Sequence, residues 1–152
     1  MKRRDGFTLI ELLTVVFLIG ILATLALFKY RDLRNSALVA QMIEEMRAVQ
    51  IAVLNYHAEK EEWPAETGPG AVPAGLGALL PGQLAASLDR GDYMLDYDNF
   101  GSAPGEVVIG VTVTSTDPKL FAKFVRTVGT RSPFFVSGSG LTYLISGPGG
   151  VF

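Results

Sequence analysis

The chain has 152 residues, which is typical of one compact domain. Its formal net charge of −2 does not indicate the basic surface that nucleic-acid-binding proteins present. Apolar residues make up 49% of the chain and the mean hydropathy is +0.33, which excludes a disordered protein. The absence of cysteine excludes thiolate metal sites, thiol catalysis and disulfides.

Residues 7–28 form a 22-residue apolar run with only four polar side chains, Thr8, Glu11, Thr14 and Thr24. A helix of this length measures about 33 Å, enough to cross a hydrocarbon core of about 30 Å. A cleaved secretory signal is disfavoured, because its apolar part spans about 7–15 residues and an Ala-x-Ala site should follow. Residues 2–5 and 29–34 each carry three basic and one acidic side chain, so charge bias does not orient the span.

Glu11 lies five positions into this apolar run. A carboxylate at the centre of a membrane helix costs about 2.5–3.5 kcal/mol, and less near the ends. A plain membrane anchor has no use for such a group. Two hypotheses follow: Glu11 reaches the interface and snorkels, or it pairs with a cation inside an assembly.

A short basic leader precedes the run Gly6-Phe7-Thr8-Leu9-Ile10-Glu11-Leu12-Leu13. Together with the unbroken apolar helix that follows, this pattern resembles the type III signal of type IV pilins and type II secretion pseudopilins. The resemblance covers residues 1–63, and beyond them it is one of architecture only.

The resemblance implies that a prepilin peptidase cuts between Gly6 and Phe7 and that the new N-terminus, Phe7, is N-methylated. Glu11 would then compensate the Phe7 amine of a neighbouring subunit. The implied partners are membrane lipid before assembly, an inner-membrane assembly platform, and other copies or pilin-like subunits. The implied location is the bacterial inner membrane as a single-pass protein with its head in the periplasm, and then a periplasmic or extracellular filament. Phe28 stands where many relatives of that family have proline, and Gly20 remains as a candidate weak point in the helix.

Residues 29–63 continue the helix with an amphipathic pattern. Pro64 is expected to stop it, near Glu62. His57 is the only histidine and has no second ligand, so a metal site there is not expected. The apolar stripe is expected to pack against the head, and it consists of Leu38, Met42, Met46, Val49, Val53 and Tyr56.

Residues 64–152 are predicted to form a globular head. Asp117 and Pro118 open a helix, as N-cap and first helical residue, and Gly129 caps its end. Residues 137–140 read as a hairpin turn, and the tail from Gly147 as irregular. The other expected elements are a short helix over 83–88 and strands over 93–98, 107–114, 134–137 and 141–146. The fold class is therefore α+β: a long N-terminal helix packed on a small, mainly antiparallel sheet with one extra short helix.

Chemistry in the head is sparse. Asp96 and Asp98 begin like an EF-hand loop, but position 12 of that loop is Val107 instead of glutamate, so they are only weak calcium candidates. A phosphate-binding glycine loop, a nucleophile elbow and a serine triad are all missing, which argues against an enzyme and against a cofactor.

The predicted organisation is a leader (1–6), a membrane and assembly segment (7–28), an amphipathic helical segment (29–63) and a head (64–152). The leading hypothesis is a structural subunit of a type IV pilus-like filament or a type II secretion pseudopilus, assembled through its N-terminal helix. The alternative is a membrane-tethered extracytoplasmic binding module that does not polymerise. The sequence leaves open secretion, adhesion, motility or DNA uptake, and a major or minor subunit.

Overall fold

The computed structural model describes residues 7–100, 107–129, 133–147 and 150–151. The chain divides into two units, Met1–Ala37 and Leu38–Phe152. The helix α1 (Leu9–Lys60) contributes its first part to unit 1 and its second part to unit 2. Gly6 and the acidic residue Glu106 lie outside the described residues.

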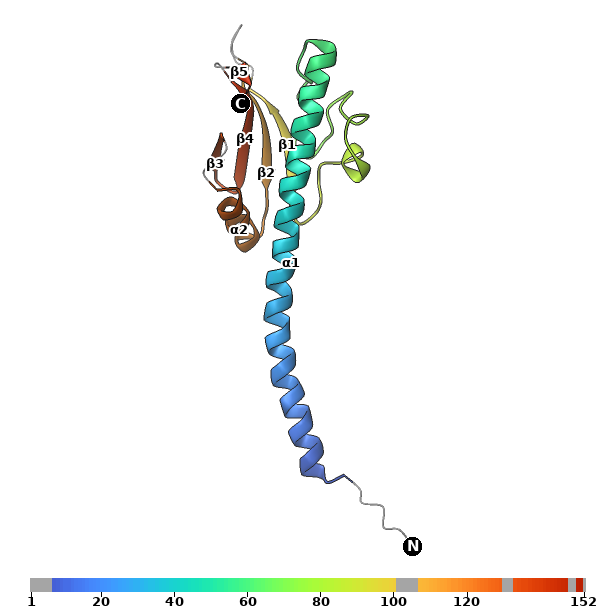
Figure 1. Ribbon diagram of the computed structural model, residues 1–152, viewed down its shortest axis with the longest axis vertical. Coiled ribbons are helices and arrows are strands. Elements are labelled where there is room, and N and C mark those ends of the chain that lie inside the picture. Colours follow the sequence, from blue (N-terminus) through green and yellow to red (C-terminus); the bar gives the residue numbers. More distant parts are fainter. Residues whose placement is uncertain (1–6, 101–106, 130–132, 148–149, 152) are drawn as a thin grey trace. The chain divides into compact units, whose positions relative to one another are not determined.

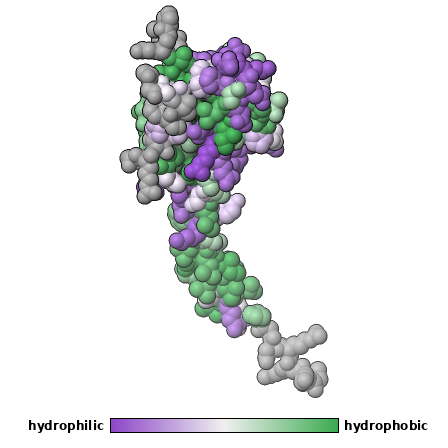
Figure 2. Space-filling model, turned by 45° about the horizontal axis from the view of Figure 1, so that its top comes forward, coloured by the Kyte–Doolittle hydropathy of each residue, from purple (hydrophilic) through white to green (hydrophobic). Residues whose placement is uncertain are grey.

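In unit 1, α1 runs through Gly20 without a break. All of its large apolar side chains are exposed, and Figure 2 shows their green colour along this part of the helix. The hydroxyls of Thr14 and Thr24 donate to the carbonyls of Ile10 and Gly20, at 2.8 and 2.9 Å. The polar atoms of these threonines are therefore satisfied within the helix, as a hydrocarbon surrounding requires.

In unit 2, antiparallel strands form a sheet in the order β1-β2-β4-β3 (Figure 1). The strands are β1 (Met94–Asn99), β2 (Ile109–Thr114), β3 (Phe134–Ser137) and β4 (Gly140–Gly147), and the short β5 (Gly150–Val151) pairs with β4. The helix α2 (Pro118–Val128) connects β2 to β3. The α+β prediction is confirmed.

One face of the sheet packs against the second part of α1. Strand residues alternate between the two faces, so Leu95 and Tyr97 of β1 and Val111 and Val113 of β2 point toward the helix and are fully buried. The expected helical stripe is confirmed at Met42, Met46, Val49 and Val53, while Leu38 and Tyr56 lie at its margin. Val39 and Ala52 are also buried and were not part of that stripe.

The sequence prediction for α2 is confirmed in detail. The Asp117 carboxylate accepts from the N–H groups of Lys119 and Leu120, at 2.8 and 3.4 Å. Gly129 ends the helix with φ +69°, a conformation in which a side chain would be strained. Leu120 and Phe124 are the two side chains of α2 that are fully buried in the core.

The end of α1 differs from the prediction. The helix stops at Lys60, because Glu61 takes a left-handed conformation with φ +57° and its N–H donates to the His57 carbonyl at 2.9 Å. Trp63 then folds back and stacks on His57, with ring centroids 3.8 Å apart and planes 2° from parallel. The chain has therefore already turned before it reaches Pro64.

Two local predictions in the head hold only in part. The short helix expected over 83–88 is a 3-10 helix, η1 (Gly82–Ala85), and it ends early, because the Leu88 N–H donates to the Gly70 carbonyl and leaves the helical path. The tail is not wholly irregular, because Gly150 and Val151 pair with β4. The hairpin prediction is confirmed: Ser137 pairs with Gly140, and Gly138 supplies the positive φ of +59°.

Candidate processing and assembly site

The expected processing junction lies immediately before α1. Phe7 and Thr8 are not helical, and 82% of the surface of Phe7 is exposed. Gly6, on the other side of the junction, lies outside the described residues. Cleavage between Gly6 and Phe7 and methylation of Phe7 remain predictions.

Thr8 and Glu11 form a capping box at the start of α1. The Thr8 N–H and hydroxyl both donate to Glu11 Oε2, at 2.9 and 2.7 Å, and the Glu11 N–H points back to the Thr8 hydroxyl oxygen at 3.4 Å. This reciprocal arrangement satisfies N–H groups that a helix otherwise leaves unpaired at its first turn. The negative carboxylate is also favoured there by the helix dipole.

The capping box gives Glu11 a role that a plain membrane anchor can also use, because the carboxylate stabilises the start of its own helix. The expectation that such an anchor has no use for Glu11 is therefore wrong. The pattern Thr-x-x-Glu before an apolar run is a recognised signal for this motif, so the sequence contained the information. Among the described residues only Thr8 donates to this carboxylate, and both bonds end on Oε2. Oε1 can therefore still accept from a neighbouring molecule.

The rest of unit 1 presents an apolar surface. α1 contains a stretch long and apolar enough to cross a membrane, and this stretch is not buried by any other described part of the chain. A soluble monomer rarely exposes a continuous apolar surface of this extent. Such a surface requires lipid, or other apolar helices, around it.

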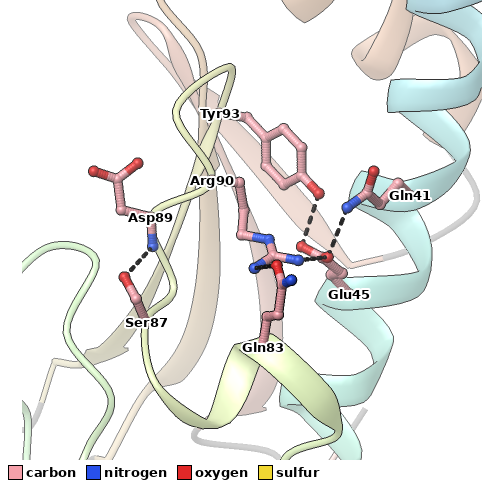
Figure 3. A network of polar contacts seen from close by, with 7 residues as sticks. All are labelled: Gln41, Glu45, Gln83, Ser87, Asp89, Arg90 and Tyr93. Atoms are coloured by element: carbon pink, nitrogen blue, oxygen red, sulfur yellow. Dashed lines mark hydrogen bonds and ion pairs between the residues drawn. The ribbon is translucent and has the colours of Figure 1, made fainter.

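A second polar centre holds the head to α1 (Figure 3). Glu45 of α1 accepts from Arg90 at 2.8 Å, from the Tyr93 hydroxyl at 2.7 Å and from the Gln41 side chain at 2.9 Å. The Arg90 and Glu45 side chains are 17% and 12% exposed. Arg90 and Tyr93 lie 45 and 48 residues after Glu45 in the chain, so no local sequence pattern indicates this network.

Burial, followed by the Glu45 carboxylate, raises the pKa of the Tyr93 hydroxyl well above its ordinary value. Tyr93 therefore remains a neutral donor at every physiological pH. The network fixes the segment that leads into β1 and leaves an open groove of about 310 Å³ beside it, lined by Gln41, Gln83, Asp89 and Asp92 among others. Its hydrogen bonds and ion pair connect α1 to the segment before β1, which is a structural role.

The weak calcium candidates lie on the outer face of β1. Asp96 and Asp98 point away from α1, and the Asp98 carboxylate accepts from the Thr112 hydroxyl of β2. Burial, Asp98 and Glu66 together raise the pKa of Asp96 to about 6, and burial with a smaller contribution from Glu66 raises the pKa of Asp98. Within the described ranges, no three His, Cys, Asp or Glu side chains are grouped so that they could hold a metal ion. Asp96 and Asp98 therefore stay weak calcium candidates, and the prediction that the chain has no metal site is still to be tested.

The described features define a class of protein: one exposed, capped apolar helix that continues into a small α+β head. Residues 1–27 match the family model described as "Prokaryotic N-terminal methylation motif". A fimbrial protein of Pseudomonas aeruginosa is 30% identical over 122 residues, which cover 75% of this chain and 79% of that protein. The chain belongs to the type IV pilin family.

Other relatives match mainly the N-terminal part. Fimbrial protein EcpC of Eikenella corrodens is 35% identical over 85 residues, which cover 56% of this chain and 53% of that protein. A type IV major pilin protein PilE1 of Neisseria gonorrhoeae is 41% identical over 61 residues, which cover 40% of this chain and 37% of that protein. The chain thus spans about half or less of the length of these two relatives. No solved structure matches the chain.

Proposed function

We propose that the chain is a structural subunit of a type IV pilus-like filament. The observation that carries the proposal is the first part of α1, which is apolar, fully exposed and capped at its start by Thr8 and Glu11. Lipid can surround this surface before assembly, and the same helices of other copies can surround it in a filament. The names of the relatives, fimbrial protein and type IV major pilin, favour a pilus over a type II secretion pseudopilus.

The proposed maturation begins with a prepilin peptidase that cuts between Gly6 and Phe7 and with N-methylation of Phe7. The subunit waits in the inner membrane with its head in the periplasm and is then moved into the filament by an assembly platform. The Phe7 amine and the Glu11 carboxylate of neighbouring subunits neutralise each other. Both charges are poorly hydrated among apolar helices, where a paired ion is tolerated and an unpaired ion is costly.

The capping contact of Glu11 with Thr8 and its proposed charge compensation can be separated by substitution. Glu11→Gln preserves the capping box, since glutamine also fits its third position, but it removes the charge. Glu11→Ala removes both. We expect both variants to insert into the membrane and both to give less filament. A normal filament yield from Glu11→Gln would restrict Glu11 to capping its own helix and would refute charge compensation.

Intact mass and electron microscopy test the function itself. The protein is extracted from membranes of cells that contain a prepilin peptidase and a pilus assembly apparatus. The expected product lacks residues 1–6 and carries one added methyl group, and filaments appear in the sheared surface fraction. An unprocessed chain with no filaments would favour the alternative, a tethered extracytoplasmic binding module that does not polymerise.

A further inference from the structure

Helix α2 presents a row of positive charges away from the core. Lys119, Lys123 and Arg126 recur at i, i+4 and i+7, which places them on one face of the helix, and no acidic residue occurs between Pro118 and Val128. Lys119 and Arg126 are exposed, whereas Leu120 and Phe124 on the other side are buried. We call Lys119, Lys123 and Arg126 the basic stripe.

The basic stripe is only partly favourable for its own helix. Like charges four residues apart on a helix repel each other, and Lys119 lies in the first turn, where the helix dipole disfavours a cation, whereas Arg126 lies in the last turn, where the dipole favours one. A surface that concentrates one sign of charge in this way is expected to meet the opposite sign elsewhere.

The outer face of β1 carries the opposite charge. Asp96 and Asp98 of β1 lie near Glu66, which accepts from the Asn99 N–H at 3.3 Å. In the part of the chain that the structure describes, neither aspartate forms an ion pair. We call Glu66, Asp96 and Asp98 the acidic surface. Glu66 is exposed and the two aspartates are half-buried. Burial first, and then the charges of Asp98 and Glu66, disfavour the ionised form of Asp96, and a cation placed there would relieve the repulsion among the carboxylates.

The two surfaces lie on different sides of unit 2. The buried side of α2 joins the core beside α1, and Arg47 and Gln50 of α1 line a cavity of about 220 Å³ together with Thr127 and Val128 at the end of α2. Asp96 and Asp98 point from the opposite face of the sheet, on β1, which is an edge strand. The basic stripe and the acidic surface of one chain therefore face in different directions and can meet only between copies.

From this charge complementarity we propose that the basic stripe of one subunit docks on the acidic surface of the next subunit. The contact joins two different surfaces, so it is heterologous, and a heterologous contact that does not close into a ring propagates as a helical filament. The inference rests on the proposed function and names the contact between heads that would set the register of neighbouring subunits.

Charge reversal in the full chain tests the proposal in cells that assemble filaments. Lys119→Glu with Arg126→Glu is expected to lower the yield of sheared filaments on the order of tenfold and to make the remainder more sensitive to salt. The matched control, Lys119→Arg with Arg126→Lys, preserves the charges and should behave as the parent. Adding Glu66→Lys and Asp96→Lys to the reversed variant should restore yield, because the charges are again complementary.

Cross-linking gives a second measurement that does not depend on yield. The chain has no cysteine, so Arg126→Cys and Glu66→Cys can be introduced together and treated with a short bismaleimide in intact filaments. A heterologous contact predicts a ladder of covalent oligomers from the double variant and only uncoupled chains from either single variant. Dimers from a single variant would indicate a symmetric contact and would overturn the proposal.

The outcomes separate the two proposals. If the parent forms no filaments, the proposed function fails and the contact fails with it. If the parent and the reversed variant form equal amounts of equally salt-resistant filament and no ladder appears, the function stands and the contact is refuted. Binding of duplex DNA by parental filaments, lost on charge reversal without a change in filament yield, would assign the basic stripe to nucleic acid instead.

Discussion

The polar network in which Glu45 accepts from Arg90, Tyr93 and Gln41 gives the most quantitative prediction for the stability of the head. Glu45→Ala removes the acceptor of Arg90 at 2.8 Å, of Tyr93 at 2.7 Å and of Gln41 at 2.9 Å. It also leaves the Arg90 guanidinium without its carboxylate at a site where only 17% of that side chain is exposed. The substitution therefore combines lost hydrogen bonds with an uncompensated, largely buried charge.

The expected cost follows from these contacts. A hydrogen bond to a charged group contributes about 1.5–3 kcal/mol, and breaking a buried ion pair costs about 3–5 kcal/mol. The remaining exposure of Arg90 allows water to hydrate the abandoned charge, which selects the lower end, about 3 kcal/mol. Residues 38–152 unfold with about 0.24 kcal/mol/K of entropy, so the melting temperature should fall by about 12 °C.

Thermal unfolding of the full chain in detergent, followed by fluorescence, measures this change. Trp63 is the only tryptophan and is packed against His57, so its emission reports on the head. The control is Glu44→Ala, an exposed carboxylate one residue away on α1, which should change stability by less than about 0.5 kcal/mol. A loss below about 1 kcal/mol for Glu45→Ala would refute the reasoning, because it would mean that solvent already screens the network.

Four further predictions concern the head. Because the pKa of Asp96 rises from 3.8 to about 6 on folding, the folded chain binds this proton more tightly, and stability falls as the pH rises through that window. Asp96→Asn should therefore stabilise the chain at pH 7 by about 1 kcal/mol after solvent screening is allowed for, and unchanged melting at pH 7 would contradict this. Asp117→Ala removes the cap of α2 and should cost about 1 kcal/mol in chemical denaturation, whereas Asp117→Asn should cost much less. The fragment from residue 36 onward should remain soluble and monomeric in gel filtration, because it retains the buried face of α1, and aggregation in mild buffer would contradict this. Added calcium should leave the melting temperature unchanged, since Asp98 is bonded to Thr112 and no three His, Cys, Asp or Glu side chains are grouped to hold a metal ion among the described residues; a rise with calcium would support Asp96 and Asp98 as ligands.

Local rules account for what the sequence predicted well. The apolar span, the helix from Pro118 to Val128 and the turn at Gly138 each depend on residues within a few positions of one another. A cap such as Asp117 acts two or three residues ahead, and an apolar stripe repeats every turn, so both can be read along the chain. The Thr8–Glu11 capping box obeys the same rule and was available to the same kind of reading.

Contacts between distant segments belong to the tertiary structure alone. No local pattern pairs Glu45 with Arg90, and none gives the strand order β1-β2-β4-β3 or places Glu66 beside Asp96. The end of α1 at Lys60 also differed from the expectation, because no sequence pattern indicates the left-handed conformation of Glu61 that turns the chain before Pro64. The sequence by itself determined that one half of α1 must leave water and that the other half must pack. Which charged side chains are buried and paired, and which face outward, depends on the folded head, because side-chain burial depends on neighbours that the linear order does not specify.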